Sequence, residues 1–318
     1  MPRPKAPNTD TVFMTKLSEK LIEKGLSAGS AMLYIIKLRK LNGDKPFTSL
    51  VFLKDTKAIK AKLDEIENIN TRKSYTTAIV SILNNTDSKQ YAAINIFYKA
   101  LLNSEKMTYD KMNHNEKSET QKENWIEWEE VLKIYNQLQE RVNDITKPLF
   151  QRGAKQDLTD HLILSLYVLS PPRRNQDYYY MKLDTGKKDD EDFNYYRPAE
   201  NKFVFNKYKT KKNYGVETIA VNTQLRKVLD NYIDLFGLVD GDFLLYNDRN
   251  RGGGNAITKS LNRVFKRNVG ASMLRHIYLT SKYGDVKDEM ANDAKAMGHS
   301  VAQQKEYILT EGKARYMY

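Results

Sequence analysis

A polar stretch at residues 105–124 divides the chain into two regions of different hydrophobic patterning. It reads EKMTYDKMNHNEKSETQKEN and offers a core almost no large apolar side chain. This composition is typical of a linker, and 318 residues suit two domains. We therefore predict a flexible arm at residues 1–10, a first domain at 11–104, a linker at 105–124 and a second domain at 125–318.

The two regions predict different secondary structure. Before the linker, five segments carry an apolar residue every three or four positions, near residues 13–24, 32–42, 59–66, 71–83 and 91–102. After it, helical segments surround residues 193–196, 202–208 and 216–221, which alternate apolar and polar side chains as strands do. The predicted fold is mainly α, with a helical first domain and a small antiparallel β-sheet in the second.

The chain is strongly basic. Its 52 Lys and Arg residues against 40 Asp and Glu residues give a net charge of +12, spread along the sequence. This distribution favours a polyanion such as nucleic acid as partner. Arg72 and Lys73, at the start of a predicted helix, are candidate phosphate contacts, although each also suits a solvated surface charge.

Several classes of protein are excluded by what the sequence lacks. Without cysteine, the chain has no disulfide framework, thiol nucleophile or thiolate zinc site. The four histidines show no metal-ligand spacing, so we expect no metal. No apolar run approaches the roughly 20 residues of a membrane span, and the first residues lack the apolar core of a signal peptide. We expect an intracellular protein that does not enter a membrane.

Four short motifs lie in order along the second region. An arginine pair is followed by an acid, and a basic turn then joins two predicted strands. Next, an Arg-His pair lies in a predicted helix, and a Gly-His pair precedes a tyrosine. The residues are Arg173, Arg174 and Asp177; Lys209 and Thr210; Arg275 and His276; and Gly298, His299 and Tyr307.

This ordered series resembles the catalytic region of tyrosine recombinases, the phage-integrase family, of the type carried by mobile elements and viruses. The resemblance covers roughly residues 125–318. It implies a catalytic domain that follows a helical core-binding domain, with the two clamping double-stranded DNA. The implied activity is site-specific DNA recombination or integration through a 3′-phosphotyrosine intermediate. It implies a homo-tetramer on DNA, no cofactor, and a location at DNA in the cytoplasm or nucleus.

The resemblance also implies a role for each motif. Tyr307 attacks the scissile phosphate, and Arg174 and Arg275 hold its non-bridging oxygens with their planar guanidinium forks. His299 assists at the phosphate, and Lys209 protonates the leaving 5′-oxygen.

Arg174 is preferred to Arg173 because of the spacing of the residues that follow. The family's first arginine is followed by an acid three residues later, a place that Asp177 occupies here. Met181 and Asp184 fit the next two positions of that motif. We expect Asp177 to fix Arg174 through a charge-assisted hydrogen bond.

The basic turn offers more than one lysine. Lys209 matches the family's Lys-Thr sequence best, but Lys207, Lys211 and Lys212 are close neighbours. These three are expected to contact DNA, and the whole turn is also compatible with non-specific phosphate binding.

Two features depart from the family pattern. Ser272, expected as a helix cap and DNA contact, stands where the family carries His or Lys, and His276 is a possible substitute on another face of the helix. The interval from His299 to Tyr307 is one residue shorter than usual, which keeps Tyr316 and Tyr318 as alternative nucleophiles. A type IB topoisomerase and a catalytically inactive DNA-binding relative are the competing functions.

Overall fold

The computed structural model describes residues 11–86, 89–112, 116–146, 152–179, 181–184, 190–247, 250–251, 255–298 and 300–307. The expected flexible arm, residues 1–10, lies outside these ranges. The chain forms two compact units, Met1–Glu116 and Lys117–Tyr318, and the boundary falls within the polar stretch. Within the described ranges, no helix is long and apolar enough to cross a membrane.

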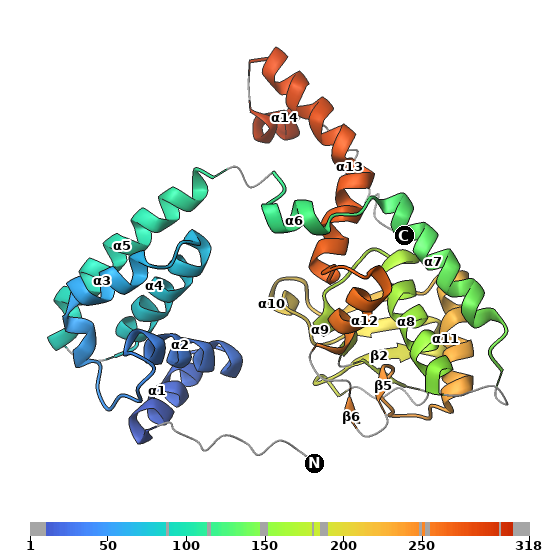
Figure 1. Cartoon of the computed structure of the whole chain (residues 1–318), viewed down its shortest axis with the longest axis horizontal. Coiled ribbons are helices and arrows are strands. Elements are labelled where there is room, and N and C mark those ends of the chain that lie inside the picture. Colours follow the sequence, from blue (N-terminus) through green and yellow to red (C-terminus); the bar gives the residue numbers. More distant parts are fainter. Residues whose placement is uncertain are drawn as a thin grey trace. The chain divides into compact units, whose positions relative to one another are not determined.

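The first unit is helical throughout its described part (Figure 1). Several of its helices begin where a polar side chain accepts a hydrogen bond from a backbone amide of the first turn, as Thr11, Ser27, Asp55 and Asn68 do. The elements are α1 (Val12–Glu23), α2 (Ala28–Leu41), the 3₁₀ helix η1 (Val51–Lys54), α3 (Thr56–Asp64), α4 (Ile69–Asn84), the 3₁₀ helix η2 (Lys89–Tyr91) and α5 (Ala92–Asp110).

One apolar core joins these helices. Leu21, Leu38 and Ile79 are fully buried and come from α1, α2 and α4. Tyr98 of α5 is also fully buried, and its hydroxyl donates a hydrogen bond to the carbonyl oxygen of Leu53 at 2.9 Å. A buried phenol that finds an acceptor adds apolar area without leaving a donor unsatisfied.

The polar stretch contains more helix than a linker composition suggests. Helix α5 continues to Asp110, and Glu105 within this part faces inward and is 4% exposed. A further helix, α6 (Glu119–Asn124), starts at a capping box in which Ser118 and Gln121 exchange side-chain and backbone hydrogen bonds. The connection between α5 and α6 is therefore shorter than residues 105–124.

The second unit packs helices around a small sheet (Figure 1). Helix α8 is central, since α7, α11 and α12 all pack against it. The helices are α7 (Trp128–Asn143), α8 (Arg152–Val168), α9 (Asn175–Tyr179), η4 (Pro198–Glu200), α10 (Lys211–Tyr214), α11 (Thr223–Phe236), α12 (Ala256–Phe265), α13 (Ala271–Ala296) and α14 (Val301–Tyr307). The strands are β1 (Met181–Leu183), β2 (Asn194–Arg197), β3 (Lys202–Phe205), β4 (Glu217–Ala220), β5 (Tyr246–Asn247) and β6 (Asn250–Arg251).

The main sheet has the order β1-β2-β3-β4. The three strands expected from the sequence form its antiparallel part, and the unexpected β1 makes the sheet mixed. Strands β2, β3 and β4 pair antiparallel, with Tyr196 opposite Phe203. Strand β1 pairs parallel to β2, with Lys182 opposite Tyr195. The chain is extended directly after α9, which allows β1 to pair with β2. The edge of β1 that faces away from β2 is bonded as well, because the amide of Leu244 donates to the Met181 carbonyl at 2.9 Å.

A buried carboxylate attaches α12 to α8. Asp160 of α8 is 3% exposed and accepts hydrogen bonds from Ser260 Oγ at 2.6 Å and from Arg263 Nε at 2.8 Å. A second guanidinium nitrogen of Arg263 and the Gln156 side chain also donate to it. Because α13 follows α12 after a short connection, this contact helps to fix the start of α13 on the unit.

Helix α13 is buried at its beginning and exposed along most of its length. Ala271, Leu274 and Ile277 are buried in the core of the unit. Farther along, Leu279 and Tyr283 are about half exposed, at 51% and 49%. Ala294 is buried near the end, where α14 packs against α13 (Figure 1).

Candidate functional site

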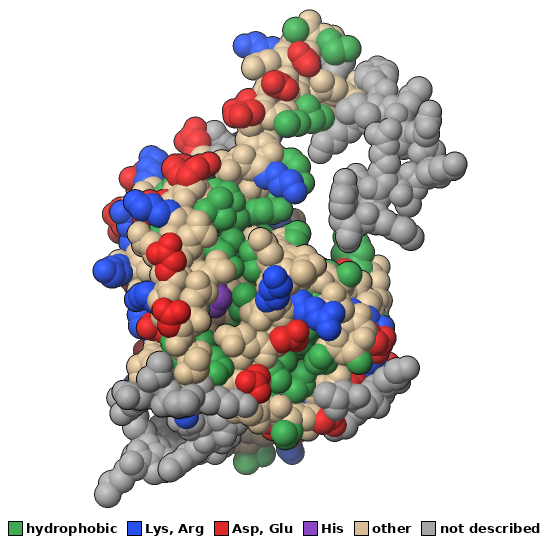
Figure 2. Space-filling view, turned by 90° about the vertical axis from the view of Figure 1, so that its right-hand side faces the viewer, with side chains coloured by type: hydrophobic (Ala, Val, Ile, Leu, Met, Phe, Trp, Pro, Cys, Tyr) green, Lys and Arg blue, Asp and Glu red, His purple; other side chains and the backbone are tan. Residues whose placement is uncertain are grey.

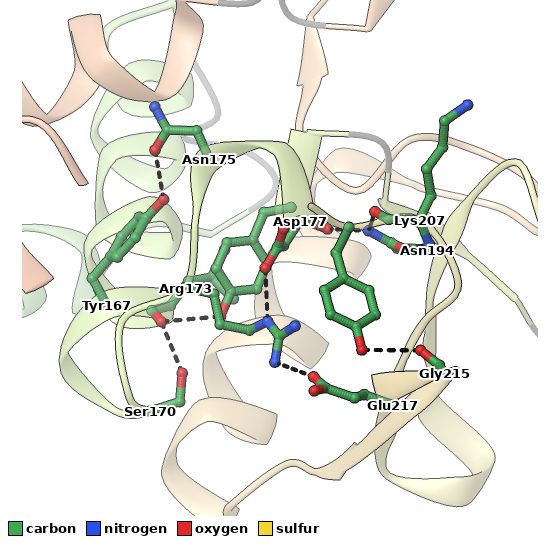
Figure 3. Close-up of polar contacts among 12 residues, drawn as sticks. Tyr167, Ser170, Arg173, Asn175, Asp177, Asn194, Lys207, Gly215 and Glu217 are labelled. Atoms are coloured by element: carbon green, nitrogen blue, oxygen red, sulfur yellow. Dashed lines mark hydrogen bonds and ion pairs between the residues drawn. The ribbon is translucent and has the colours of Figure 1, made fainter. Parts of the chain in front are cut away.

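Arg173 lies at the centre of a polar network just before α9 (Figure 3). Its Nε donates to Asp177 Oδ2 at 2.9 Å, and its Nη1 donates to Glu217 Oε2 at 2.8 Å. Its Cζ lies 3.9 Å from the centre of the Phe205 ring. Burial alone would lower the pKa of Arg173, but the hydrogen bonds and charges of Glu217 and Asp177 raise it. The guanidinium is thus held at two edges and on one face.

The acid of the arginine motif therefore engages Arg173, and the expected hydrogen bond between Asp177 and the Arg174 side chain is not formed. Arg173 takes the acid because Glu217 and the Phe205 ring hold the same guanidinium. Burial raises the pKa of Asp177, and the charges of Arg173 and Arg174 oppose that rise. The Arg174 side chain is half-buried and makes no hydrogen bond or ion pair with any residue that the structure describes.

Arg275 is the second arginine of the series and lies in the first turns of α13. Its side chain is half-buried, and its Nε is buried without a hydrogen-bond partner in the described ranges. Its positive charge acts on Tyr167, where it opposes a rise in the phenol pKa that burial causes. A buried guanidinium nitrogen without a partner is costly, and an anionic ligand would satisfy it.

A chain of hydrogen bonds connects the surroundings of the two arginines. The Tyr167 hydroxyl donates to Asn175 Oδ1 at 2.9 Å, as Figure 3 shows. The Asn175 amide donates in turn to Thr258 Oγ1 at 3.0 Å. Asn175 directly follows Arg174 in the sequence. The charge of Arg275 acts on the pKa of the Tyr167 phenol. This network, built from α8, α9 and α12, thus adjoins Arg174 in sequence and lies within reach of the charge of Arg275.

Lys209 lies in the turn that leads from β3 into α10. Its side chain is exposed and has no hydrogen bond or ion pair with the described residues. The preceding Tyr208 is buried, and its hydroxyl donates to the Gly215 carbonyl at 2.9 Å. Gly215 has φ +74° and ψ −152°, which side chains rarely permit, so a glycine closes this turn.

The neighbouring lysines divide by their contacts. Lys207 lies 3.3 Å from Asp192, and Lys211 lies 2.5 Å from Glu191. Lys212 is exposed. The first two are thus close to acids from the segment before β2, and exposed ion pairs of this kind contribute little to stability.

The space-filling view indicates how charge is distributed on one side of the molecule. On that face, acidic and basic side chains are intermingled around hydrophobic ones (Figure 2). The excess of 52 basic over 40 acidic residues therefore does not form a uniform basic surface there.

Ser272 and His276 are both exposed on the first turns of α13. The expectation that Ser272 caps this helix is wrong. The cap position is Gly270, without a side-chain hydrogen bond, because the helix already begins at Ala271. Ser272 is therefore a helical residue with its side chain in solvent.

The Gly-His-Ser motif lies between α13 and α14. Gly298 has φ +74°, and Ser300 Oγ accepts a hydrogen bond from the Gln303 amide at 3.2 Å, which caps α14. His299 lies outside the described residues, as do Tyr316 and Tyr318. Tyr307 is the last residue of α14, and its side chain lies outside the described atoms.

The two candidate phosphate contacts of the first unit make local contacts. Arg72 donates from Nε and Nη2 to the Ile66 carbonyl at 3.0 and 2.8 Å. The Lys73 ammonium lies 3.4 Å from the centre of the Tyr109 ring. Arg72 thus closes the segment after α3, and Lys73 forms a cation–π contact with α5.

Sequence reasoning missed the residues that support the candidate site. Glu217, Asn175 and Tyr167 have no motif of their own. The spacing of four residues between Arg173 and Asp177 was a signal, since such a pair suits one helical turn. The bond from Arg173 to Glu217, by contrast, depends on how β4 pairs in the sheet.

The described residues contain no group of three or more His, Asp or Glu side chains placed to hold a metal ion. Comparisons with known protein families, with curated proteins and with solved structures find no match to this chain. The functional conclusion therefore depends on the residues themselves.

Proposed function

We propose that this protein is a site-specific tyrosine recombinase or integrase, which cuts and rejoins double-stranded DNA through a 3′-phosphotyrosine intermediate. The basic composition, the ordered motif series and the arrangement of the two arginines support the proposal. A homo-tetramer on two DNA duplexes is the assembly proposed for strand exchange.

The observation that carries the proposal is the contrast among three arginines. The Arg173 guanidinium is engaged by two carboxylates. Arg174 and Arg275 are half-buried and lack side-chain hydrogen bonds within the described chain. Arg174 directly precedes Asn175 of the Tyr167 network, and the charge of Arg275 acts on Tyr167. Two such guanidinium groups match the non-bridging oxygens of one phosphate, which a lone surface arginine does not explain.

The proposed reaction has two steps, cleavage of a DNA strand and its rejoining. The Tyr307 hydroxyl passes its proton to His299, and its oxygen forms a bond to the scissile phosphorus while the bond from phosphorus to the 5′-oxygen breaks. Arg174, Arg275 and His299 stabilise the charge on the phosphoryl oxygens, and Lys209 supplies the proton to the leaving 5′-oxygen. Attack by a 5′-hydroxyl on the phosphotyrosine reverses these bonds and releases Tyr307. The phosphotyrosine retains the energy of the phosphodiester, so no cofactor is consumed.

Covalent trapping tests the proposal. Duplexes selected for binding from a random library are made with a nick near each phosphate in turn, so that the short 5′-hydroxyl fragment diffuses away after cleavage. We expect a protein–DNA adduct that survives denaturation and is lost with Tyr307→Phe. Arg174→Ala and Arg275→Ala should each slow adduct formation by about 100-fold or more.

Tyr316→Phe and Arg226→Ala are matched controls, and both should retain the adduct. Arg226 lies 3.4 Å from Asp230 in an exposed ion pair, far from the arginine motifs in sequence. Specific binding without any adduct would overturn the proposal in favour of a DNA-binding protein. Adducts that relax supercoiled circles but never join two duplexes would indicate a type IB topoisomerase instead.

A further inference from the structure

The hairpin that carries Lys209 is attached to α9 through Arg173. Its descending strand begins with Glu217, whose carboxylate lies 2.8 Å from Arg173 Nη1. Its ascending strand ends with Phe205, whose ring lies against the same guanidinium at 3.9 Å. Arg173 thus contacts both strands at the base of the turn. Through Asp177, it also contacts the helix that follows Arg174.

A second contact fixes the same base. The Asn194 side chain accepts from the Lys207 amide at 2.7 Å and donates to the Lys207 carbonyl at 3.0 Å. The same amide group donates to the Asp177 carbonyl at 2.7 Å. Asn194 is fully buried, and Figure 3 shows it between Asp177 and Lys207. The chain entering the turn is therefore tied to α9 two residues before Lys209.

Above this base, the turn is held within itself by the bond from the Tyr208 hydroxyl to the Gly215 carbonyl, and Lys211 pairs with Glu191. Tyr208 is buried, but Lys209 and Lys212 are exposed. A lysine has a long flexible stem, so its ammonium reaches a fixed point only when its backbone is placed. The contacts at the base determine where the Lys209 backbone stands relative to Arg174.

We propose that Arg173 is a positioning residue that holds the Lys209 turn in register with the phosphate-binding Arg174, acting through Glu217. This inference depends on the proposed recombinase function. Nε and Nη1 of Arg173 are already engaged by Asp177 and Glu217, so we assign the phosphate to Arg174 and a supporting role to Arg173. Its loss impairs proton delivery by Lys209 and leaves the phosphate contacts of Arg174 in place.

A change of leaving group separates these two effects. When sulfur replaces the bridging 5′-oxygen, the bond from phosphorus to sulfur breaks and the thiolate leaves without a proton, because a thiol is far more acidic than an alcohol. A variant that is defective in proton delivery should therefore regain its rate on the sulfur substrate. A variant that is defective in holding the phosphate should stay slow on both substrates. Adduct formation is measured in single turnover on the oxygen and sulfur substrates.

Glu217→Gln is the mildest test, since it keeps the side-chain shape and removes the charge that pairs with Arg173. We expect a loss of about 10-fold on the oxygen substrate and less than about 2-fold on the sulfur substrate. Arg173→Lys should show the same pattern, and Lys209→Ala a larger one of about 100-fold on oxygen. Arg174→Lys should lose activity equally on both substrates.

Glu191→Gln is the matched control, because Glu191 also pairs with a lysine of this turn, at 2.5 Å, but is 76% exposed. It should change neither rate. Equal losses on both substrates for Glu217→Gln and Arg173→Lys would overturn the inference, as would no loss on either. A wild-type protein that forms no adduct with either substrate would overturn the proposed function, and the inference with it.

Discussion

Removal of the Asp160 carboxylate should destabilise the second unit far more than its single charge suggests. Asp160→Ala takes away the acceptor of the Ser260 hydroxyl, which is 2% exposed and bonded at 2.6 Å. A buried donor left unsatisfied costs about 1–3 kcal/mol. The Arg263 side chain is 45% exposed and can bind water once the carboxylate is gone, so losing its ion pair should cost about 1 kcal/mol. We therefore expect a loss of about 3 kcal/mol in the free energy of unfolding.

Calorimetry of the full chain measures this loss. For a unit of this size, each kcal/mol lowers the Tm by about 2–4 °C, so Asp160→Ala should lower it by about 6–12 °C. Glu130→Ala is the control, since Glu130 and Lys133 form an exposed pair at 3.9 Å in the same unit. That variant should cost less than about 1 kcal/mol.

The double variant Asp160→Ala/Ser260→Ala sharpens the test. Removing the hydroxyl together with its acceptor leaves no unsatisfied donor, so this variant should recover about 1 kcal/mol relative to Asp160→Ala. Two results would refute the reasoning. One is a Tm shift for Asp160→Ala no larger than that of Glu130→Ala, and the other is a double variant less stable than the sum of the two single changes.

Two further predictions concern buried ionisable groups. Burial outweighs the Thr76 hydrogen bond and raises the pKa of Glu105, so its stabilising effect is present below the unfolded pKa and lost as the pH rises through the folded pKa. Glu105→Gln should therefore stabilise the first unit at pH 7 but not near pH 4, and urea unfolding that shows equal effects at both pH values would contradict this. Burial lowers the pKa of His161 to about 4, so the second unit should lose stability, on the order of 3 kcal/mol, as the pH falls from about 6.5 towards 4. His161→Phe keeps the stacking on Tyr135 and should remove this loss of stability between about pH 6.5 and 4. The same loss in the variant would show that His161 does not cause it.

Periodicity predicted the longer helices well, because these bury an apolar face against the core of their own unit. The segment after Asn222 is an example, since the side chain of that residue caps α11 and the helix ends at Gly237, which has φ +61°. The polar stretch was harder to interpret. Within this stretch the last turns of α5 bury only Glu105, so few apolar positions mark them as helix. The capping box of Ser118 and Gln121 at the start of α6 was a readable signal.

The candidate site was predictable where the signal was local and not where it depended on tertiary contacts. The hairpin around Lys209 follows from alternation on both sides of a basic turn, and the structure forms it between β3 and β4. Strand β1 was missed because its three residues are too few to show an alternating pattern. The choice of Asp177's partner depended on Glu217 and Phe205, which no spacing near Arg173 reveals.

The uneven burial of α13 has a consequence for amide hydrogen exchange. Its first turns are held by Leu274 and Ile277 in the core, so their amides should exchange only when much of the unit opens. Beyond Leu279 the helix depends mainly on its own backbone hydrogen bonds, and exchange there should proceed through small local openings. One unbroken helix thus places Arg275 in a segment that we expect to exchange slowly, while its middle part, between Leu279 and the buried Ala294, should exchange rapidly.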